Sequence, residues 1–117
     1  MLKNIYLIEA SSSEGLIYKI GITKREVSER IKDFKTGNVS DFNVIKIYKS
    51  EKFVHSIEKR LHKYFHKKRI DMSREWFNLT EDDINEFIPL CEKYYNMFDY
   101  IENNNTWCEN SNKSKFK

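Results

Sequence analysis

The most informative stretch of this 117-residue chain is Tyr18-Lys19-Ile20-Gly21-Ile22-Thr23. Together with the apolar pair that precedes it, this stretch predicts a strand over residues 16–22. A second strand is predicted upstream, over residues 2–9, because residues 5–8 are apolar or aromatic without interruption. Such a run is typical of a strand that is covered on both faces. Residues 11–15 form a turn between them, so the chain should open with a β-hairpin.

The segment after the hairpin predicts a helix and then a third strand. Thr23 and Glu26 have the spacing of a capping box, in which each side chain accepts a hydrogen bond from the other residue's amide. Gly37 stands where a glycine commonly follows the end of a helix. Alternation over residues 42–48 predicts the third strand. The apolar face of the helix is expected at Val27, Ile31 and Phe34.

A second helix is expected over about residues 51–67, with Ser50 as its cap. Glu58 falls near the edge of the apolar stripe of this helix when residues are placed 100° apart. A carboxylate at that edge is partly buried and still meets solvent. The stripe itself comprises Val54, Ile57, Leu61 and Phe65.

The C-terminal part predicts one more helix. Thr80 and Asp83 have capping-box spacing and start it. Pro89 lies inside the helical pattern, so a kink or a break is expected there. From about residue 103 the chain is rich in Asn, Ser and Lys, which favours a polar, flexible tail.

These elements predict an α+β fold: a small three-stranded antiparallel sheet flanked by helices, in the order β-β-α-β-α, with a C-terminal helix. The length suits a single domain. Residues 1–80 would form the core, residues 81–102 a helical extension packed on it, and residues 103–117 the tail.

Charge is distributed unevenly along the chain. Residues 1–70 carry sixteen Lys or Arg against eight Asp or Glu, whereas residues 71–117 carry five against ten. A basic front suggests a polyanionic partner. Cys91 and Cys108 lack the spacing of a C-x-x-C motif and favour a reducing, intracellular compartment. No apolar run approaches the roughly 20 residues that span a bilayer, so no membrane partner is expected.

The motifs, in this order, resemble the GIY-YIG nuclease superfamily. They are most similar to its small phage branch, known from a phage T5 open reading frame and from meiotically up-regulated genes. The resemblance covers about residues 3–80 and implies a three-stranded antiparallel sheet flanked by helices. The matching runs are Ile5-Tyr6-Leu7, residues 18–23, Arg30, Thr36-Gly37, residues 58–65 (E-K-R-L-H-K-Y-F) and Glu75-Trp76-Phe77.

The resemblance implies a catalytic set of Tyr6, Lys19, Arg30 and Glu58, in which Glu58 binds Mg²⁺, with Mn²⁺ as a substitute. Lys19 occupies the place of the superfamily's second tyrosine. Because strand side chains alternate, Lys19 is expected to face the site and the neighbouring Tyr18 the core. Phe34 stands where other branches often have His. Supporting roles are implied for Tyr18, His62 and Glu75.

The implied chemistry is hydrolysis of a DNA phosphodiester, in a duplex or a branched substrate, with RNA left open. A tyrosine has a pKa of about 10, and a nearby cation such as Lys19 would lower it so that Tyr6 can act as a general base. Arg30 would bind the non-bridging phosphate oxygens. Products would carry 5′-phosphate and 3′-hydroxyl ends. Cations expected along the nucleic-acid backbone are Lys24, Arg25, Lys59 and Lys63.

Other interpretations stay open at this level. The fold could serve a nucleic-acid-binding module that does not cut, or a protein-interaction module that uses its acidic third helix. A homodimer or a separate specificity partner would compensate for the small size of the domain. The site residues also have structural alternatives: Tyr6 as a packed aromatic, Arg30 paired with Glu26, and Glu58 paired with His62.

Overall fold

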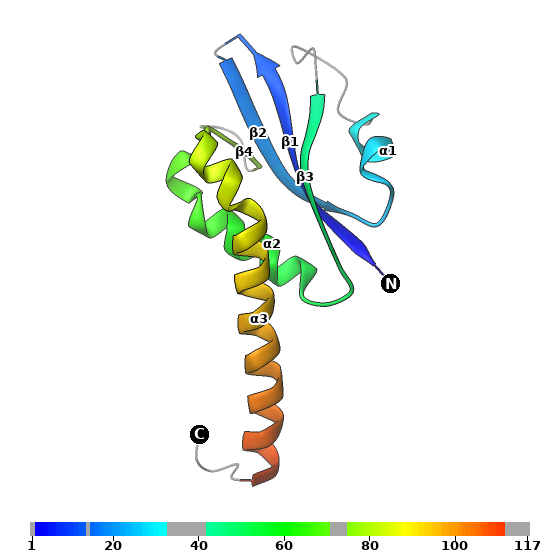
Figure 1. Ribbon diagram of the computed structural model, residues 1–117, viewed down its shortest axis with the longest axis vertical. Coiled ribbons are helices and arrows are strands. Elements are labelled where there is room, and N and C mark those ends of the chain that lie inside the picture. Colours follow the sequence, from blue (N-terminus) through cyan, green and yellow to red (C-terminus); the bar gives the residue numbers. More distant parts are fainter. Residues whose placement is uncertain (1, 14, 33–41, 71–74, 112–117) are drawn as a thin grey trace.

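A computed structural model describes residues 2–13, 15–32, 42–70 and 75–111, with side chains as far as residue 104. The predicted α+β fold is confirmed (Figure 1). In this described part of the chain, the antiparallel sheet has four strands where the sequence predicted three, in the order β3-β1-β2-β4. The strands are β1 (Lys3–Ser12), β2 (Gly15–Thr23), β3 (Phe42–Ser50) and the two-residue β4 (Trp76–Phe77).

The hairpin of β1 and β2 forms the centre of the sheet. In its register Tyr6 lies opposite Gly21, and Glu9 lies opposite Tyr18. On its other side β1 pairs with β3, with a register shift between Leu7 and Ile8. The sequence pattern missed β4 as a strand because two residues are too few to show an alternation.

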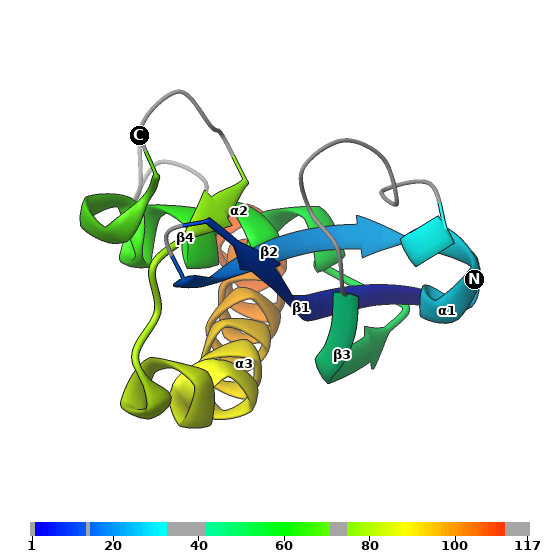
Figure 2. The same ribbon diagram turned by 90° about the horizontal axis from the view of Figure 1, so that it is seen from above.

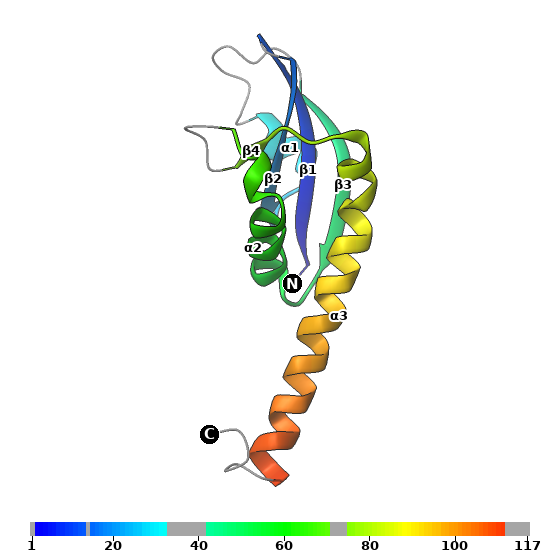
Figure 3. The same ribbon diagram turned by 90° about the vertical axis from the view of Figure 1, so that its left-hand side faces the viewer.

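Within the described ranges, the sheet is flanked by the helices α1 (Val27–Ile31), α2 (Val54–Tyr64) and α3 (Glu81–Ser111). A short 3₁₀ turn, η2 (His66–Lys68), follows α2. Figure 2 shows α3 and α1 on opposite sides of the central strands, and Figure 3 shows α2 and α3 lying along the strands. The far end of α3 projects beyond the sheet, which accounts for the elongated dimensions of 56 × 30 × 24 Å.

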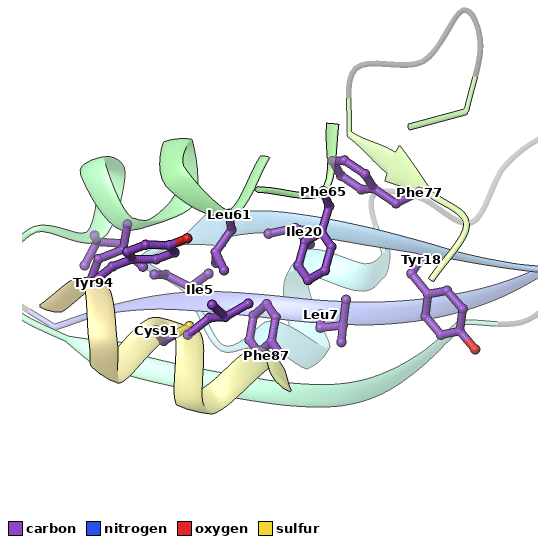
Figure 4. Close-up of a cluster of buried hydrophobic side chains, with 13 residues drawn as sticks. Ile5, Leu7, Tyr18, Ile20, Leu61, Phe65, Phe77, Phe87, Cys91 and Tyr94 are labelled. Carbon is purple, nitrogen blue, oxygen red and sulfur yellow. The ribbon is translucent and has the colours of Figure 1, made fainter. Parts of the chain in front are cut away.

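The main core lies where α2 and α3 pack against the sheet (Figure 4). Ile5 and Leu7 of β1 contribute to it, as do Leu61 of α2 and Phe87 of α3, and all four are fully buried. A second, smaller cluster covers the other face of the sheet, beneath α1. It comprises Tyr6, Ile8, Val27 and Ile31, with Phe42 and Trp76 packed against it.

The capping box expected at Thr23 does not form. Thr23 is the last residue of β2, opposite Asn4, and its hydroxyl oxygen accepts a hydrogen bond from the Arg25 amide at 3.0 Å. Helix α1 therefore begins at Val27, after the strand pairing has ended. Phe34, predicted for its apolar face, and Gly37, predicted at its end, lie outside the described residues.

The start of α2 also differs from the expectation. Ser50 belongs to β3, opposite Lys3, and its hydroxyl oxygen accepts a hydrogen bond from the Lys52 amide at 3.2 Å. The helix begins at Val54, after Phe53 in the left-handed region at φ 63°. Ser50 thus shapes the turn that leads into the helix instead of capping it.

The capping box at the start of α3 is confirmed. The Thr80 hydroxyl oxygen accepts a hydrogen bond from the Asp83 amide at 3.2 Å, and the Thr80 amide donates to the Asp83 carboxylate at 2.9 Å. The helix is continuous through Pro89, so the expected break is absent. Buried Leu90 and Cys91 hold the turn after the proline against the core. The helix continues to Ser111, past its expected end near residue 102.

Length alone does not make α3 a membrane segment. Its first turn carries Glu81, Asp82 and Asp83, and charged residues recur along it. Among the described residues, no helix combines the length and the apolar character that crossing a bilayer requires. Cys91 is a buried free thiol, whereas the side chain of Cys108 lies outside the described part.

Candidate active site

A pocket of about 600 Å³ collects most of the residues that the sequence singled out. Tyr6 and Ile22 line it from the sheet, and Arg30 lines it from α1. Glu58 of α2 also lines it, as does Glu75, which directly precedes β4. Tyr6, Arg30 and Glu58 are far apart in the sequence, and the fold brings them to one cavity.

The Tyr6 side chain lies across Gly21 on the neighbouring strand. A Cβ atom placed on Gly21 would lie 2.3 Å from the Tyr6 hydroxyl oxygen, closer than any side chain tolerates. Gly21 is therefore required because the phenol occupies the space of its missing side chain. Tyr6 itself is 1% exposed and its ring is fixed in the smaller core cluster.

The electrostatic setting of Tyr6 differs from the expectation. Burial raises its pKa to about 12, and the negative charges of Glu75 and Glu58 act in the same direction. The charge of Arg30 and a hydrogen bond from its side chain lower the pKa, but they do not cancel the burial. The phenol is thus neutral near pH 7, and the cation that acts on it most is Arg30 rather than Lys19.

Three residues of α2 share the side of the helix that lines the pocket: His55, Glu58 and His62. The Glu58 side chain is 26% exposed, and its Oε2 lies 3.7 Å from Nε2 of His62. Nε2 of His62 also donates to the carbonyl oxygen of Ile20 at 3.0 Å, which anchors α2 to β2. His55 accepts a hydrogen bond from the Lys3 ammonium group at 3.1 Å.

The pKa of Glu58 is raised, first by burial and then by the negative charge of Glu75. His55 and Lys19 lower it, with smaller effects. The carboxylates of Glu58 and Glu75 repel each other across the pocket. A cation bound in the pocket would relieve this repulsion. The pairing of Glu58 with His62 does not exclude a second role for the carboxylate.

Lys19 and Tyr18 point to opposite faces of the sheet, as strand alternation predicts. The Lys19 ammonium lies 2.7 Å from the Glu75 carboxylate and 5.6 Å from the centre of the Trp76 ring. Lys19 is 7% exposed and reaches the cavity through Glu75 rather than lining it directly. Tyr18 belongs to the main core, where its hydroxyl donates to Glu9 at 3.0 Å.

The expected nucleic-acid contacts lie outside this pocket. Lys24, Arg25, Lys59 and Lys63 are all exposed, and none of them lines it. The residue that does line it is Arg69, at the end of the basic run of residues 59–69. The sequence showed the charge of this run but not which member reaches the cavity, because that depends on how η2 turns back toward β4.

The pocket suits a cation that needs few protein ligands. Among the described residues, no group of three or more His, Cys, Asp or Glu side chains is arranged to hold a metal ion. Mg²⁺ is commonly held by one or two carboxylates and keeps several waters, and Glu58 with Glu75 nearby fits that requirement.

Residues 3–92 match the T5orf172 domain, which is more than half of the chain. The chain belongs to the T5orf172 domain family. Searches of curated proteins and of solved structures found no match. Every pocket residue named above falls within the matched span, whereas the projecting end of α3 lies beyond it. The pocket is therefore part of the T5orf172 domain itself.

Proposed function

We propose that this T5orf172 domain is a metal-dependent endonuclease of the GIY-YIG type that hydrolyses phosphodiester bonds in DNA. The observation that carries the proposal is the convergence of Tyr6, Arg30 and Glu58, from three separate elements, on one open pocket. A phenol, a guanidinium and a carboxylate supply a proton acceptor, an anion-binding fork and a metal ligand. Metal-assisted phosphodiester hydrolysis uses these three functions together.

Arg30 is the phosphate-binding residue in this proposal. Its guanidinium fork can bind two non-bridging oxygens at once and stabilise the charge that develops on phosphorus. Its charge and a hydrogen bond from its side chain are the two influences that lower the pKa of Tyr6. The same side chain therefore links the phosphate site to the proposed base.

Glu58 would hold Mg²⁺, or Mn²⁺ in its place, and Glu75 adds negative charge nearby. A bound ion would neutralise charge on the phosphate and stabilise the departing oxygen. The charges of Glu75 and Glu58 are also two of the causes that raise the pKa of Tyr6. Tyr6 would take the proton of the attacking water.

The substrate class in this proposal is DNA, either duplex or branched, and RNA remains an alternative. Cleavage would leave 5′-phosphate and 3′-hydroxyl ends. The exposed cations Lys24, Arg25, Lys59 and Lys63 would contact flanking phosphates, which makes binding dependent on salt. Such a domain would act inside the cell, alone, as a homodimer or with a separate specificity partner.

A second candidate function is nucleic-acid binding without cleavage. Two observations favour it: burial raises the pKa of Tyr6 to about 12, and the Lys19 ammonium forms an ion pair with Glu75. A neutral phenol that never ionises would leave a binding pocket but no base.

Incubation with supercoiled plasmid separates the two candidates. Wild-type protein with Mg²⁺ or Mn²⁺ should nick or linearise the plasmid, and EDTA should prevent it. Glu58→Gln should abolish cleavage, whereas Glu81→Gln, which removes an exposed carboxylate at the start of α3, should cleave as the wild type does. A plasmid that is shifted in a low-salt gel but never cut would favour the binding module.

A further inference from the structure

We infer that Arg69 binds the phosphate that neighbours the scissile one, so that the pocket grips two successive phosphates of a nucleic-acid strand. This inference rests on the proposed function and extends it to the way the substrate is held. Arg69 lines the same pocket as Arg30, Glu58 and Tyr6. It would make the pocket selective for a polynucleotide over an isolated phosphodiester.

The backbone around Arg69 is held in place at several points. The Arg69 amide donates to the carbonyl oxygen of His66 at 3.2 Å, and Arg69 forms a β-bridge with Phe77. On either side, the Ile70 amide donates to Trp76 at 2.9 Å and the Asn78 amide donates to Lys68 at 2.8 Å. Arg69 thus projects from a backbone that is tied to β4 and, through it, to β2.

The Arg69 side chain is also oriented by its surroundings. Its guanidinium carbon lies 5.6 Å from the centre of the Phe77 ring, which is fully buried in the main core. An arginine that rests on an aromatic face keeps its N–H groups directed outward, where an anion can accept from them. Among the described residues, no carboxylate forms an ion pair with Arg69. Lys68, by contrast, is bonded to Asp83.

Arg30 and Arg69 reach the pocket from elements at opposite edges of the sheet. Arg30 belongs to α1, which contacts β3 at one edge, whereas Arg69 is bridged to β4 at the other edge. Figure 1 shows α1 and β4 on either side of the central hairpin. Two guanidinium groups brought in from opposite edges suit two separate anions better than one. Successive phosphates of one strand are such a pair.

A comparison of two substrates tests this inference. One is an oligonucleotide duplex, and the other is bis(p-nitrophenyl) phosphate, a single phosphodiester with no neighbouring phosphate. Arg69→Gln should lower kcat/KM for the duplex by about tenfold to a hundredfold, as expected for a lost charge-assisted hydrogen bond. It should leave kcat/KM for bis(p-nitrophenyl) phosphate unchanged. Arg30→Gln should impair both substrates.

A binding measurement in EDTA gives a readout that does not depend on cleavage. Arg69→Gln should reduce the slope of log affinity against log salt by about one phosphate contact, or roughly 0.9 for duplex DNA. Arg69→Lys should keep this slope while losing part of the affinity, because it retains the charge but not the fork. Lys67→Gln, which removes an exposed cation in η2 outside the pocket, should lower affinity less than Arg69→Gln.

Two outcomes would overturn the inference. One is an equal loss on both substrates, and the other is an unchanged salt slope in Arg69→Gln protein that is folded by circular dichroism. If wild-type protein cuts neither substrate yet binds the duplex, the proposed nuclease function fails, and the salt slope still decides the role of Arg69.

Discussion

The Tyr6 hydroxyl occupies the space that a side chain on Gly21 would fill. An added Cβ would lie 2.3 Å from the hydroxyl oxygen and 2.5 Å from the ring carbon that carries it. The two residues are also directly opposite each other on β1 and β2. Gly21 therefore provides the space that the Tyr6 side chain of the neighbouring strand occupies.

Gly21→Ala tests this relationship. The new methyl group must push the phenol away from its position, and a misplacement of about 1 Å can cost on the order of a hundredfold in rate. We expect cleavage to fall by that amount while the protein loses about 1–3 kcal/mol of stability from overpacking. Plasmid cleavage and urea unfolding measure the two effects. Full activity in a folded Gly21→Ala variant would contradict the placement of Tyr6.

The raised pKa of Tyr6 predicts a pH dependence. Because burial and the nearby carboxylates raise this pKa to about 12, the neutral phenol persists through the neutral range. The fraction of phenolate then grows about tenfold with each pH unit below the pKa. Single-turnover cleavage should rise continuously between about pH 7 and 9. A rate that stays constant or falls over this range would show that Tyr6 does not act as the base.

The Lys19–Glu75 pair predicts non-additive substitutions. Glu75→Gln removes the partner of a 7%-exposed ammonium group and should destabilise the fold by about 1–3 kcal/mol. Adding Lys19→Met should restore part of that loss, because the buried ammonium group that the Glu75 carboxylate stabilised is gone as well. A double-mutant cycle in urea measures the coupling free energy. Purely additive effects would show that the ion pair does not hold Glu75 in place.

The start of α3 predicts an acid-sensitive contribution to stability. Burial alone would raise the pKa of Asp83, but hydrogen bonds from Lys68 and Thr80 outweigh it and hold the pKa below its usual range. The stabilisation is present above the unfolded-state pKa and is lost as the pH falls through the lower folded-state value. Asp83→Asn should cost about 1 kcal/mol at pH 7 and less below about pH 4. A cost that is independent of pH would contradict this account.

Much of the fold could be read from local patterns. The hairpin, the third strand and the Thr80 cap depend on neighbouring residues, so alternation and spacing predicted them. The false caps at Thr23 and Ser50 show the limit of such patterns. Each hydroxyl oxygen accepts a hydrogen bond from the amide two residues later in the chain. However, Thr23 pairs with Asn4 and Ser50 pairs with Lys3 in the sheet, so the helices begin several residues after these two residues.

The site was harder to predict, because its electrostatics depend on contacts between distant segments. Alternation along β2 placed Lys19 and Tyr18 on the correct faces. It could not show that Glu75, more than fifty residues later, would bind the Lys19 ammonium group. The sequence could not place Arg69 in the pocket for the same reason, because its position there depends on the bridge between residues 69 and 77.

The most direct test of the central claim compares two tyrosines that each lose a single oxygen atom. Tyr6→Phe removes a hydroxyl from the pocket, whereas Tyr18→Phe removes one from the opposite face of the same hairpin. Supercoiled plasmid in Mg²⁺ is the substrate for both. We expect Tyr18→Phe to cut the plasmid still and Tyr6→Phe to lose on the order of a hundredfold or more in rate, as for a missing general base. Equal cleavage by the two variants would contradict a role for Tyr6 in the reaction.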